Sequence, residues 1–224
     1  MPIRNFEGDT FVAFLDLCGF KELMRNEDKA WRALDSLYQT GFEVLRENHH
    51  QHRIEGIFVS DSGVLFVRGN ERPQDITLEI DLQSLLIAVK QINKAMLNVN
   101  LMLTTSIAYG KFKYQERIEF VGIEKNPIYG NAYASAYFDN AVGSPRIQPG
   151  QCRLVKRGLP PTFNELNFSD EYRGLIRERH GDAGHYYYYW NVDRSLDVEA
   201  FEDRYTDAYN LKYQGMLKAL KGGI

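Results

Sequence analysis

The chain has 224 residues, which is enough for a full hydrophobic core and one main domain. Apolar residues make up 44% of it, charged residues 25%, and the net charge is −3, so nothing in the composition suggests a nucleic-acid binder. No stretch approaches the roughly 18 apolar residues of a membrane span, and residues 1–5 lack the apolar region of a signal peptide. The two cysteines, Cys18 and Cys152, have no metal-type spacing, and we expect a reducing cytoplasm as the location.

Residues 10–20 (TFVAFLDLCGF) form the most informative segment of the N-terminal part. The near-continuous apolar run before Asp16 predicts a buried strand. Asp16 stands at the end of that strand, and Gly19 then allows the chain to turn toward a helical pattern. A carboxylate at this place either caps the next helix or belongs to a metal or phosphate site.

A long amphipathic helix is predicted over residues 27–47, with Asn26 as its N-cap. Its apolar face is expected to consist of Trp31, Leu34, Leu37, Tyr38, Phe42 and Leu45, which recur at three- and four-residue steps. Residues 54–59 and 63–67 then read as a β-hairpin around a short polar turn that carries Asp61.

The middle of the chain continues with alternating helical and strand patterns. We predict a helix over residues 75–98, a strand over 101–109, a polar segment over 111–116, a strand over 117–123, a turn over 124–127, a helix from 131 to about 143 and a strand over 151–155. In the remaining segment we predict a strand over 185–190 and a helix over 195–220.

The order strand, helix, hairpin, helix, strand is the βαββαβ order of a ferredoxin-like core with an antiparallel sheet. We therefore expect an α+β fold, with residues 1–157 as the main domain and residues 158–224 as a strand and helix extension packed on it. This fold supports many activities, so the function has to be argued from particular residues.

The two aspartates are the strongest candidates for chemistry. In a ferredoxin-like core the first strand and the following hairpin are neighbours, so Asp16 and Asp61 can converge. Two carboxylates are a suitable seat for Mg²⁺ or Mn²⁺, and two such ions can support an in-line displacement at phosphorus. The backbone N–H groups of residues 17–20 can hold a triphosphate, and the Leu17 carbonyl is a further possible metal ligand. Spacing alone equally allows one helix cap and one turn residue.

Several motifs resemble those of the class III nucleotidyl cyclases. Residues 14–20 (FLDLCGF) are similar to that family's first metal motif, and residues 59–62 (VSDS) are similar to the hairpin with the second metal aspartate. Residues 106–110 (SIAYG) resemble its following strand, and residues 128–137 (IYGNAYASAY) its late strand-to-helix segment. The resemblance covers about residues 8–157 and implies a catalytic cyclase domain there.

Within this family the sequence is most similar to the pyrimidine cyclases of the Pycsar anti-phage systems. The combination of FLDLCGFK, SDS, YGNAYASAY and SPRI carries that resemblance. It implies conversion of UTP to cyclic UMP and pyrophosphate with two divalent ions, Mn²⁺ or Mg²⁺, at Asp16, Leu17 and Asp61. It also implies triphosphate binding by Cys18, Gly19 and Phe20, and a separate effector activated by the cyclic nucleotide.

The sequence departs from the purine cyclases at the positions that read the base. Ile57 stands where those enzymes have a lysine, and Pro127 where they have an acid. Their transition-state Asn and Arg would fall on Ala134 and Phe138. The candidates that could replace these groups are Arg53, Lys111 and Arg146 for charge, and Ile57, Asn126, Tyr129 and Asn131 around the nucleoside.

The family resemblance further implies a head-to-tail homodimer with two composite sites, in which residues near Tyr129 come from the partner chain. Two alternative functions stay open. The enzyme could form cyclic CMP or a purine cyclic nucleotide instead, or the chain could be a dimeric adaptor that senses nucleotides without catalysis. We expect no nucleic acid and no membrane span among its interactions.

Overall fold

The computed structural model describes residues 3–69, 78–115, 118–120, 123–125, 127–164 and 167–192. Its elements in chain order are β1 (Phe6–Leu17), α1 (Phe20–Leu23), α2 (Glu27–His52), β2 (Ile54–Val59), β3 (Ser62–Val67), α3 (Leu78–Asn98), β4 (Leu103–Tyr114), β5 (Ile118–Phe120), β6 (Ile123–Lys125), β7 (Ile128–Tyr129), α4 (Asn131–Val142), β8 (Cys152–Val155), β9 (Ile176–Arg179) and β10 (Asp182–Tyr188). The predicted helix over residues 195–220 lies outside the described residues.

One mixed sheet organises the molecule, with the strand order β2-β3-β1-β4-β8-β10-β9. The first four strands in this order are antiparallel, as a ferredoxin-like core requires, and β8 adds parallel to β4 after the α4 crossover. The predicted α+β fold with an antiparallel core is therefore confirmed. The strand β10 pairs with β8, so the segment after residue 157 extends the same sheet; the division at residue 157 stays a prediction.

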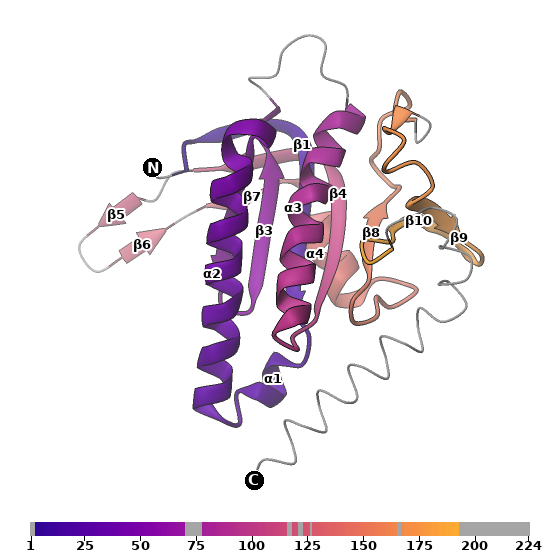
Figure 1. Cartoon of the computed structure of the whole chain (residues 1–224). Helices are drawn as coiled ribbons and strands as arrows, with labels where there is room; N and C mark the ends of the chain where they lie inside the picture. Colours follow the sequence, from indigo (N-terminus) through magenta and orange to yellow (C-terminus); the bar gives the residue numbers. More distant parts are fainter. Residues whose placement is uncertain are drawn as a thin grey trace.

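The two faces of the sheet are covered by different helices. The helices α2 and α3 lie side by side on one face, and α4 lies behind the sheet in Figure 1. Phe11, Ala13 and Leu15 of β1 pack on the α2/α3 side, whereas Val12 and Phe14 pack with α4. Because alternate residues of a strand point to opposite faces, β1 contributes to both cores.

Most predicted elements are present; the short α1 and β7 were not predicted, β6 occupies residues 124 and 125 of the predicted turn, and three further differences concern strands. The strand β4 continues to Tyr114, so the predicted end of this strand at residue 109 is too early, and residues 111–114 of the predicted polar segment belong to β4. The hairpin of β5 and β6 replaces the single predicted strand over residues 117–123. The strand β9 was not predicted, because its sequence, IRER, has no apolar run.

The predicted apolar face of the long helix is only partly correct. Asn26 caps α2, since its side-chain oxygen accepts a hydrogen bond from the Lys29 N–H at 3.0 Å. Leu37 is fully buried, but Trp31 and Phe42 are 69% and 64% exposed. The helix therefore carries a second line of apolar residues that does not face the sheet.

A buried polar network holds the second half of α4 against the sheet. Asp139 of α4 accepts hydrogen bonds from Ser106 of β4 at 2.6 Å and from the Arg153 guanidinium of β8 at 2.8 Å. His185 of β10 lies between two carboxylates, with Nε2 2.9 Å from Asp139 and Nδ1 2.8 Å from Asp182. Burial opposes a charged ring, but the hydrogen bonds to these two carboxylates outweigh it and raise the pKa of His185.

This network predicts a pH-dependent stability. The pKa of His185 is higher in the folded state than in the unfolded state, where it is near 6.5. The protonated ring therefore stabilises the fold fully at pH values below 6.5, and this stabilisation is lost as the pH rises through the pKa of the folded state. We expect the free energy of unfolding of wild type, relative to His185→Gln, to fall across that interval. Urea unfolding at a series of pH values measures the difference.

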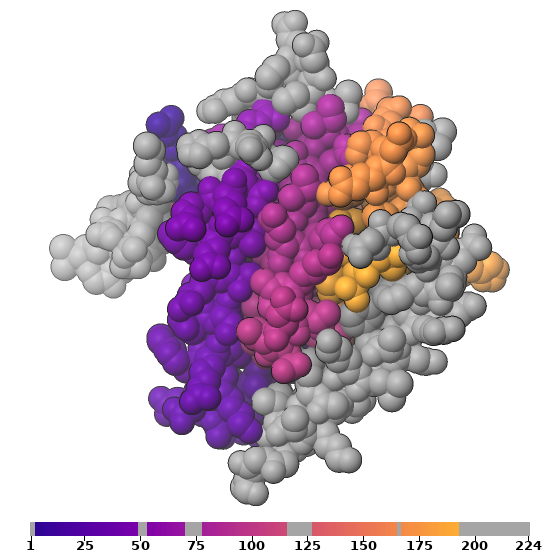
Figure 2. Space-filling model, in the orientation of Figure 1, coloured from indigo at the N-terminus to yellow at the C-terminus, as the bar shows by residue number. Residues whose placement is uncertain are grey.

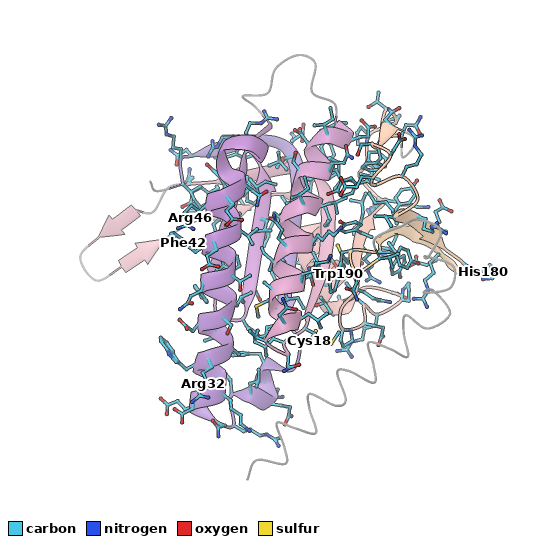
Figure 3. All side chains as sticks on the ribbon, in the orientation of Figure 1. Cys18, Arg32, Phe42, Arg46, His180 and Trp190 are labelled. Atoms are coloured by element: carbon cyan, nitrogen blue, oxygen red, sulfur yellow. The ribbon has the colours of Figure 1, made fainter. Side chains whose placement is uncertain are left out.

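The exposed His180 of the same hairpin supplies the matched control (Figure 3). His180→Gln should reproduce the wild-type dependence on pH, because its side chain lies outside the network. A His185→Gln variant whose stability follows the wild-type curve at every pH would contradict a protonated bridge.

Candidate active site

The end of β1 places Asp16 on the same face of the sheet as α4. Val12 and Phe14 pack with the α4 side, and Asp16 is the next residue of that alternation. Across the sheet, Asp16 pairs with Ser62 of β3 on one side and with Thr104 of β4 on the other. Its side chain is partly buried at the end of the sheet that leads into α1 (Figure 1).

The hairpin turn brings Asp61 to this point. The turn consists of Ser60, whose φ of 54° is left-handed, and Asp61. The Leu17 N–H donates to the Asp61 carbonyl at 3.0 Å, which ties the turn to the end of β1. The Ser62 hydroxyl donates to Asp16 Oδ1 at 3.1 Å. The predicted convergence of the two aspartates is therefore present in the structure.

The two carboxylates repel each other. Burial, and next the charge of Asp61, raise the pKa of Asp16 to about 6, although the Ser62 hydrogen bond acts in the opposite direction. A site with this local excess of negative charge and hard oxygen donors suits a divalent cation. The residues present thus fit the predicted Mg²⁺ or Mn²⁺ ions, and Asp16 and Asp61 are the side chains that would hold them.

No group of three or more His, Cys, Asp or Glu side chains with metal-site geometry occurs within the described part of the chain. Cys18 does not enlarge the donor set, because burial and the neighbouring Asp16 raise the pKa of its thiol to about 12 and keep it protonated. Any further ligand at this place has to come from backbone carbonyls, water or substrate oxygens, which is the usual pattern for Mg²⁺.

Part of the predicted phosphate-binding loop after β1 is already hydrogen-bonded. The Cys18 N–H donates to the Met102 carbonyl at 2.9 Å and is therefore occupied in this structure, so its role as a phosphate donor stays a prediction. Gly19 turns the chain with a φ of 76°. The N–H groups of Gly19 and Phe20 make no backbone hydrogen bond to the residues that the structure describes. These two groups are the remaining donors of the predicted set.

Three of the predicted residues lie together at the other end of the sheet. Tyr129 of β7 pairs with Lys113 of β4, and the Asn131 side chain packs over Gly110. Lys111 stands between these positions on β4, and the alternation with Phe112 and Tyr114 puts it and Tyr129 on the α2/α3 side of the sheet, whereas Asn131 is on the α4 side. Thr104, beside Asp16, lies further along β4, roughly 20 to 30 Å away at the usual strand rise. One chain therefore does not bring Tyr129, Asn131 or Lys111 to the acid pair.

The remaining candidates occupy different places. Arg53 precedes β2, at the end of that strand remote from Asp61, and forms an ion pair with Asp81 at 3.1 Å. Arg146 is exposed in the loop after α4, and that loop reaches the acid-pair end of the sheet, where the Gly150 N–H donates to the Leu103 carbonyl at 2.8 Å. Ile57 is partly buried and packs on the α4 side of β2. Asn126 lies outside the described residues.

The sequence analysis did not single out three residues beside the acid pair. Ser62 orients Asp16, and it stands next to Asp61 in a motif that was quoted only for its aspartate. The Thr104 hydroxyl donates to Asn140 Oδ1 at 3.0 Å, beside Asp16. No local signal could have joined Thr104 to Asn140, because 36 residues separate them.

Neither a protein-family model nor a curated protein matches this chain. Solved structures do match over most of its length. The adenylyl cyclase CyaB from P. aeruginosa is 14% identical, with a TM-score of 0.54 over 83% of this chain and 94% of that one. The guanylyl cyclase Cya2 is 13% identical, with a TM-score of 0.54 over 83% and 92%.

A third structure is the guanylate cyclase domain of RhGC from Catenaria anguillulae, in complex with GTP. It is 8% identical, with a TM-score of 0.56 over 83% of this chain and 96% of that one. At such identities the likeness shows a shared fold, which is that of class III adenylyl and guanylyl cyclase domains.

The repulsion within the acid pair predicts a stabilising substitution when metal is absent. Asp61→Asn should lower the pKa of Asp16 and raise the free energy of unfolding at pH 8 by on the order of 0.5 kcal/mol. The gain should shrink at pH 5, where the Asp16 side chain is largely protonated in wild type. Urea unfolding in EDTA at both pH values measures it.

Asp170→Asn is the control, because that side chain is 93% exposed and remote from β1. It should change stability equally little at both pH values. Destabilisation by Asp61→Asn at pH 8 would show that the two carboxylates do not oppose each other.

Proposed function

We propose that this protein is a nucleotidyl cyclase that converts a nucleoside triphosphate, with UTP as the favoured substrate, to a 3′,5′-cyclic nucleotide and pyrophosphate. The observation that carries the proposal is the pair Asp16 and Asp61, held together at the end of β1 in a fold shared with adenylyl and guanylyl cyclase domains. A chain that used these residues only as a cap and a turn would have no need for two repelling carboxylates.

In this reaction the ribose 3′-oxygen forms a bond to the α-phosphorus, and the bond from that phosphorus to the β-phosphate oxygen breaks. Pyrophosphate leaves, and the hydroxyl proton passes to solvent. Divalent ions held by Asp16, Asp61 and the Leu17 carbonyl would favour the ionised hydroxyl and neutralise the leaving group. Ser62 orients Asp16, and the N–H groups of Gly19 and Phe20 hold the phosphates.

A second subunit would complete the site. The acid pair lies at one end of the α4 side of the sheet. Asn131 lies at the other end of that side, and Tyr129 and Lys111 lie near the same end on the opposite side of the strands. A two-fold axis between these ends would place the Tyr129 end of one protomer against the acid pair of its partner. This head-to-tail arrangement gives two composite sites and accounts for the separation within one chain.

The outer surface of α4 supports this arrangement. The only charged residue of α4 is Asp139, which is buried in the polar network. The outer surface instead presents Tyr137, Phe138 and Val142, which are 41%, 58% and 75% exposed. Val59, which pairs with Ser62 beside the hairpin turn on the same side of the sheet, is 64% exposed. An uncharged apolar helix surface is typical of the centre of a protein interface.

The pocket chemistry favours a pyrimidine over a purine. Ile57 is apolar and packs against the sheet, so it cannot donate a hydrogen bond to adenine as the lysine of the purine cyclases does. Arg146, in the loop beside the acid pair, is the proposed replacement for the missing transition-state arginine, and Tyr129, Asn131 and Asn126 of the partner would line the nucleoside. By its resemblance to the anti-phage pyrimidine cyclases, the product would activate a separate effector during infection.

Incubation of the purified chain with each of four labelled nucleoside triphosphates and Mn²⁺ tests the activity. We expect cyclic UMP as the main product. Asp16→Asn and Asp61→Asn should each lower its formation by at least about 100-fold, because metal ligation supplies several kcal/mol of the transition-state stabilisation.

Asp170→Asn is the control and should retain activity, since this side chain is 93% exposed and remote from β1. Cyclic CMP or a purine product would correct the substrate. Binding of nucleotide without turnover would favour the adaptor function, and unchanged turnover in Asp61→Asn would remove the metal role.

The composite site predicts that catalysis depends on concentration. Specific activity should fall on dilution in step with the fraction of dimer measured by analytical ultracentrifugation. Phe138→Asp should weaken the dimer by at least about tenfold, because a charge would be buried at the interface. Val99→Asp, at an exposed apolar position outside α4, is the control. Full activity in a strictly monomeric sample would contradict the shared site.

A further inference from the structure

The outer side of α2 carries a line of aromatic residues that the proposed site does not use. Trp31, Tyr38 and Phe42 are 69%, 39% and 64% exposed, and their spacing of seven and four residues aligns them along one side of the helix. Tyr38 touches Phe58 of β2 at a ring-centroid distance of 5.9 Å, so the line lies beside the edge strand of the sheet. Figure 2 shows the coloured part of α2 exposed on this face of the molecule.

We infer that this aromatic line is a self-association surface, on which α2 of a second copy packs antiparallel. A two-fold axis between residues 36 and 37 places Trp31 of one helix opposite Phe42 of the other, and Asp35 opposite Tyr38. Positions 31, 35, 38 and 42 have the alternating spacing of four and three residues with which two helices interlock; three of them are aromatic, and the fourth is Asp35, which lies opposite the Tyr38 ring and its hydroxyl. The contact is isologous, so each aromatic pair occurs twice.

The charges of α2 fit the same register. Asp28 and Arg46 lie on one flank of the aromatic line, and Arg32 and Glu43 lie further out on that flank. In an antiparallel pair the same flanks meet, so Asp28 faces Arg46 and Arg32 faces Glu43 across the axis, twice each. Figure 3 shows Phe42 and Arg46 adjacent on α2, with Arg32 nearer its N-terminal end. The Arg46 guanidinium lies 5.7 Å from the centre of the Phe42 ring.

This surface is independent of the proposed composite dimer. The helix α2 covers one face of the sheet and α4 covers the other, so both contacts can form on the same protomer. Two different isologous contacts would join dimers into tetramers or longer assemblies, whereas each contact alone closes at two copies. The inference therefore goes beyond the proposed function.

Charge exchange tests the register. Asp28→Arg and Arg46→Asp should each weaken association through α2 by about tenfold or more, because each places like charges opposite each other. The double variant, Asp28→Arg with Arg46→Asp, should restore the wild-type constant, since it only exchanges the two partners. Sedimentation velocity over a concentration series of the full chain measures all three. Failure of the double variant to recover would overturn the antiparallel register.

Tryptophan emission provides a second, local readout. The chain has two tryptophans, of which Trp31 is exposed and Trp190 is 2% exposed. Emission of wild type should shift to shorter wavelength as concentration rises, and the Trp31→Phe variant should show no shift. If the emission of wild type does not depend on concentration, the inference is overturned. The aromatic line would then be either a free surface or a binding site for a different protein.

Substitutions on the two helices separate this inference from the proposed function. Phe42→Ser should remove the association step through α2 and leave cyclase activity at the wild-type level. Phe138→Asp should remove the other step together with activity. Ile80→Ser, at an exposed position of α3, is the control for loss of a surface apolar group. A Phe42→Ser variant that sediments like wild type overturns the α2 contact, even if the cyclase assay succeeds.

Discussion

The burial of β1 on both faces is the constraint on which the rest of the structure depends. Leu15 and Phe14 are neighbours in sequence but belong to two different hydrophobic clusters, one beneath α2 and α3 and one beneath α4. A shift of one residue in the register of β1 would exchange these two sets of side chains, so the strand has a single allowed position. Asp16 continues the α4-side alternation, and its place is therefore determined by the packing of the core.

The same constraint explains how a strand of the core can end in a repelling pair of acids. The β1–β3 register sets Asp16 opposite Ser62, and the two-residue turn then leaves Asp61 beside it. The repulsion between Asp16 and Asp61 destabilises the fold at this place, and the hydrogen bond from Ser62 to Asp16 offsets part of it. Carboxylates that are held close together at the expense of stability are typical of sites that bind cations.

The C-terminal strands contribute to this arrangement from a distance. The bonds from Arg153 and His185 to Asp139 attach α4 to β8 and β10, while Ala132 and Ala136 attach its first half by close apolar packing. Since the outer side of α4 is uncharged, its position determines which apolar surface a second protomer would meet in the proposed dimer. The extension after residue 157 is thereby connected to the face that carries the acid pair, through β10 and not through any residue of the site.

The sequence by itself determined the order of the core elements, the hairpin and the two aspartates, because these depend on local apolar periodicity and on residues close together in the chain. It could not determine the Asp139 network, the Thr104–Asn140 contact or the separation of Tyr129 from Asp16, because these depend on the register of strands far apart in sequence. The same limit applies to α2, where helical spacing grouped Trp31 and Phe42 with Leu37 but could not show which side meets the sheet. Only the tertiary structure decided which side of α2 is buried. The helix has apolar residues on two sides, and only one of them packs against the sheet.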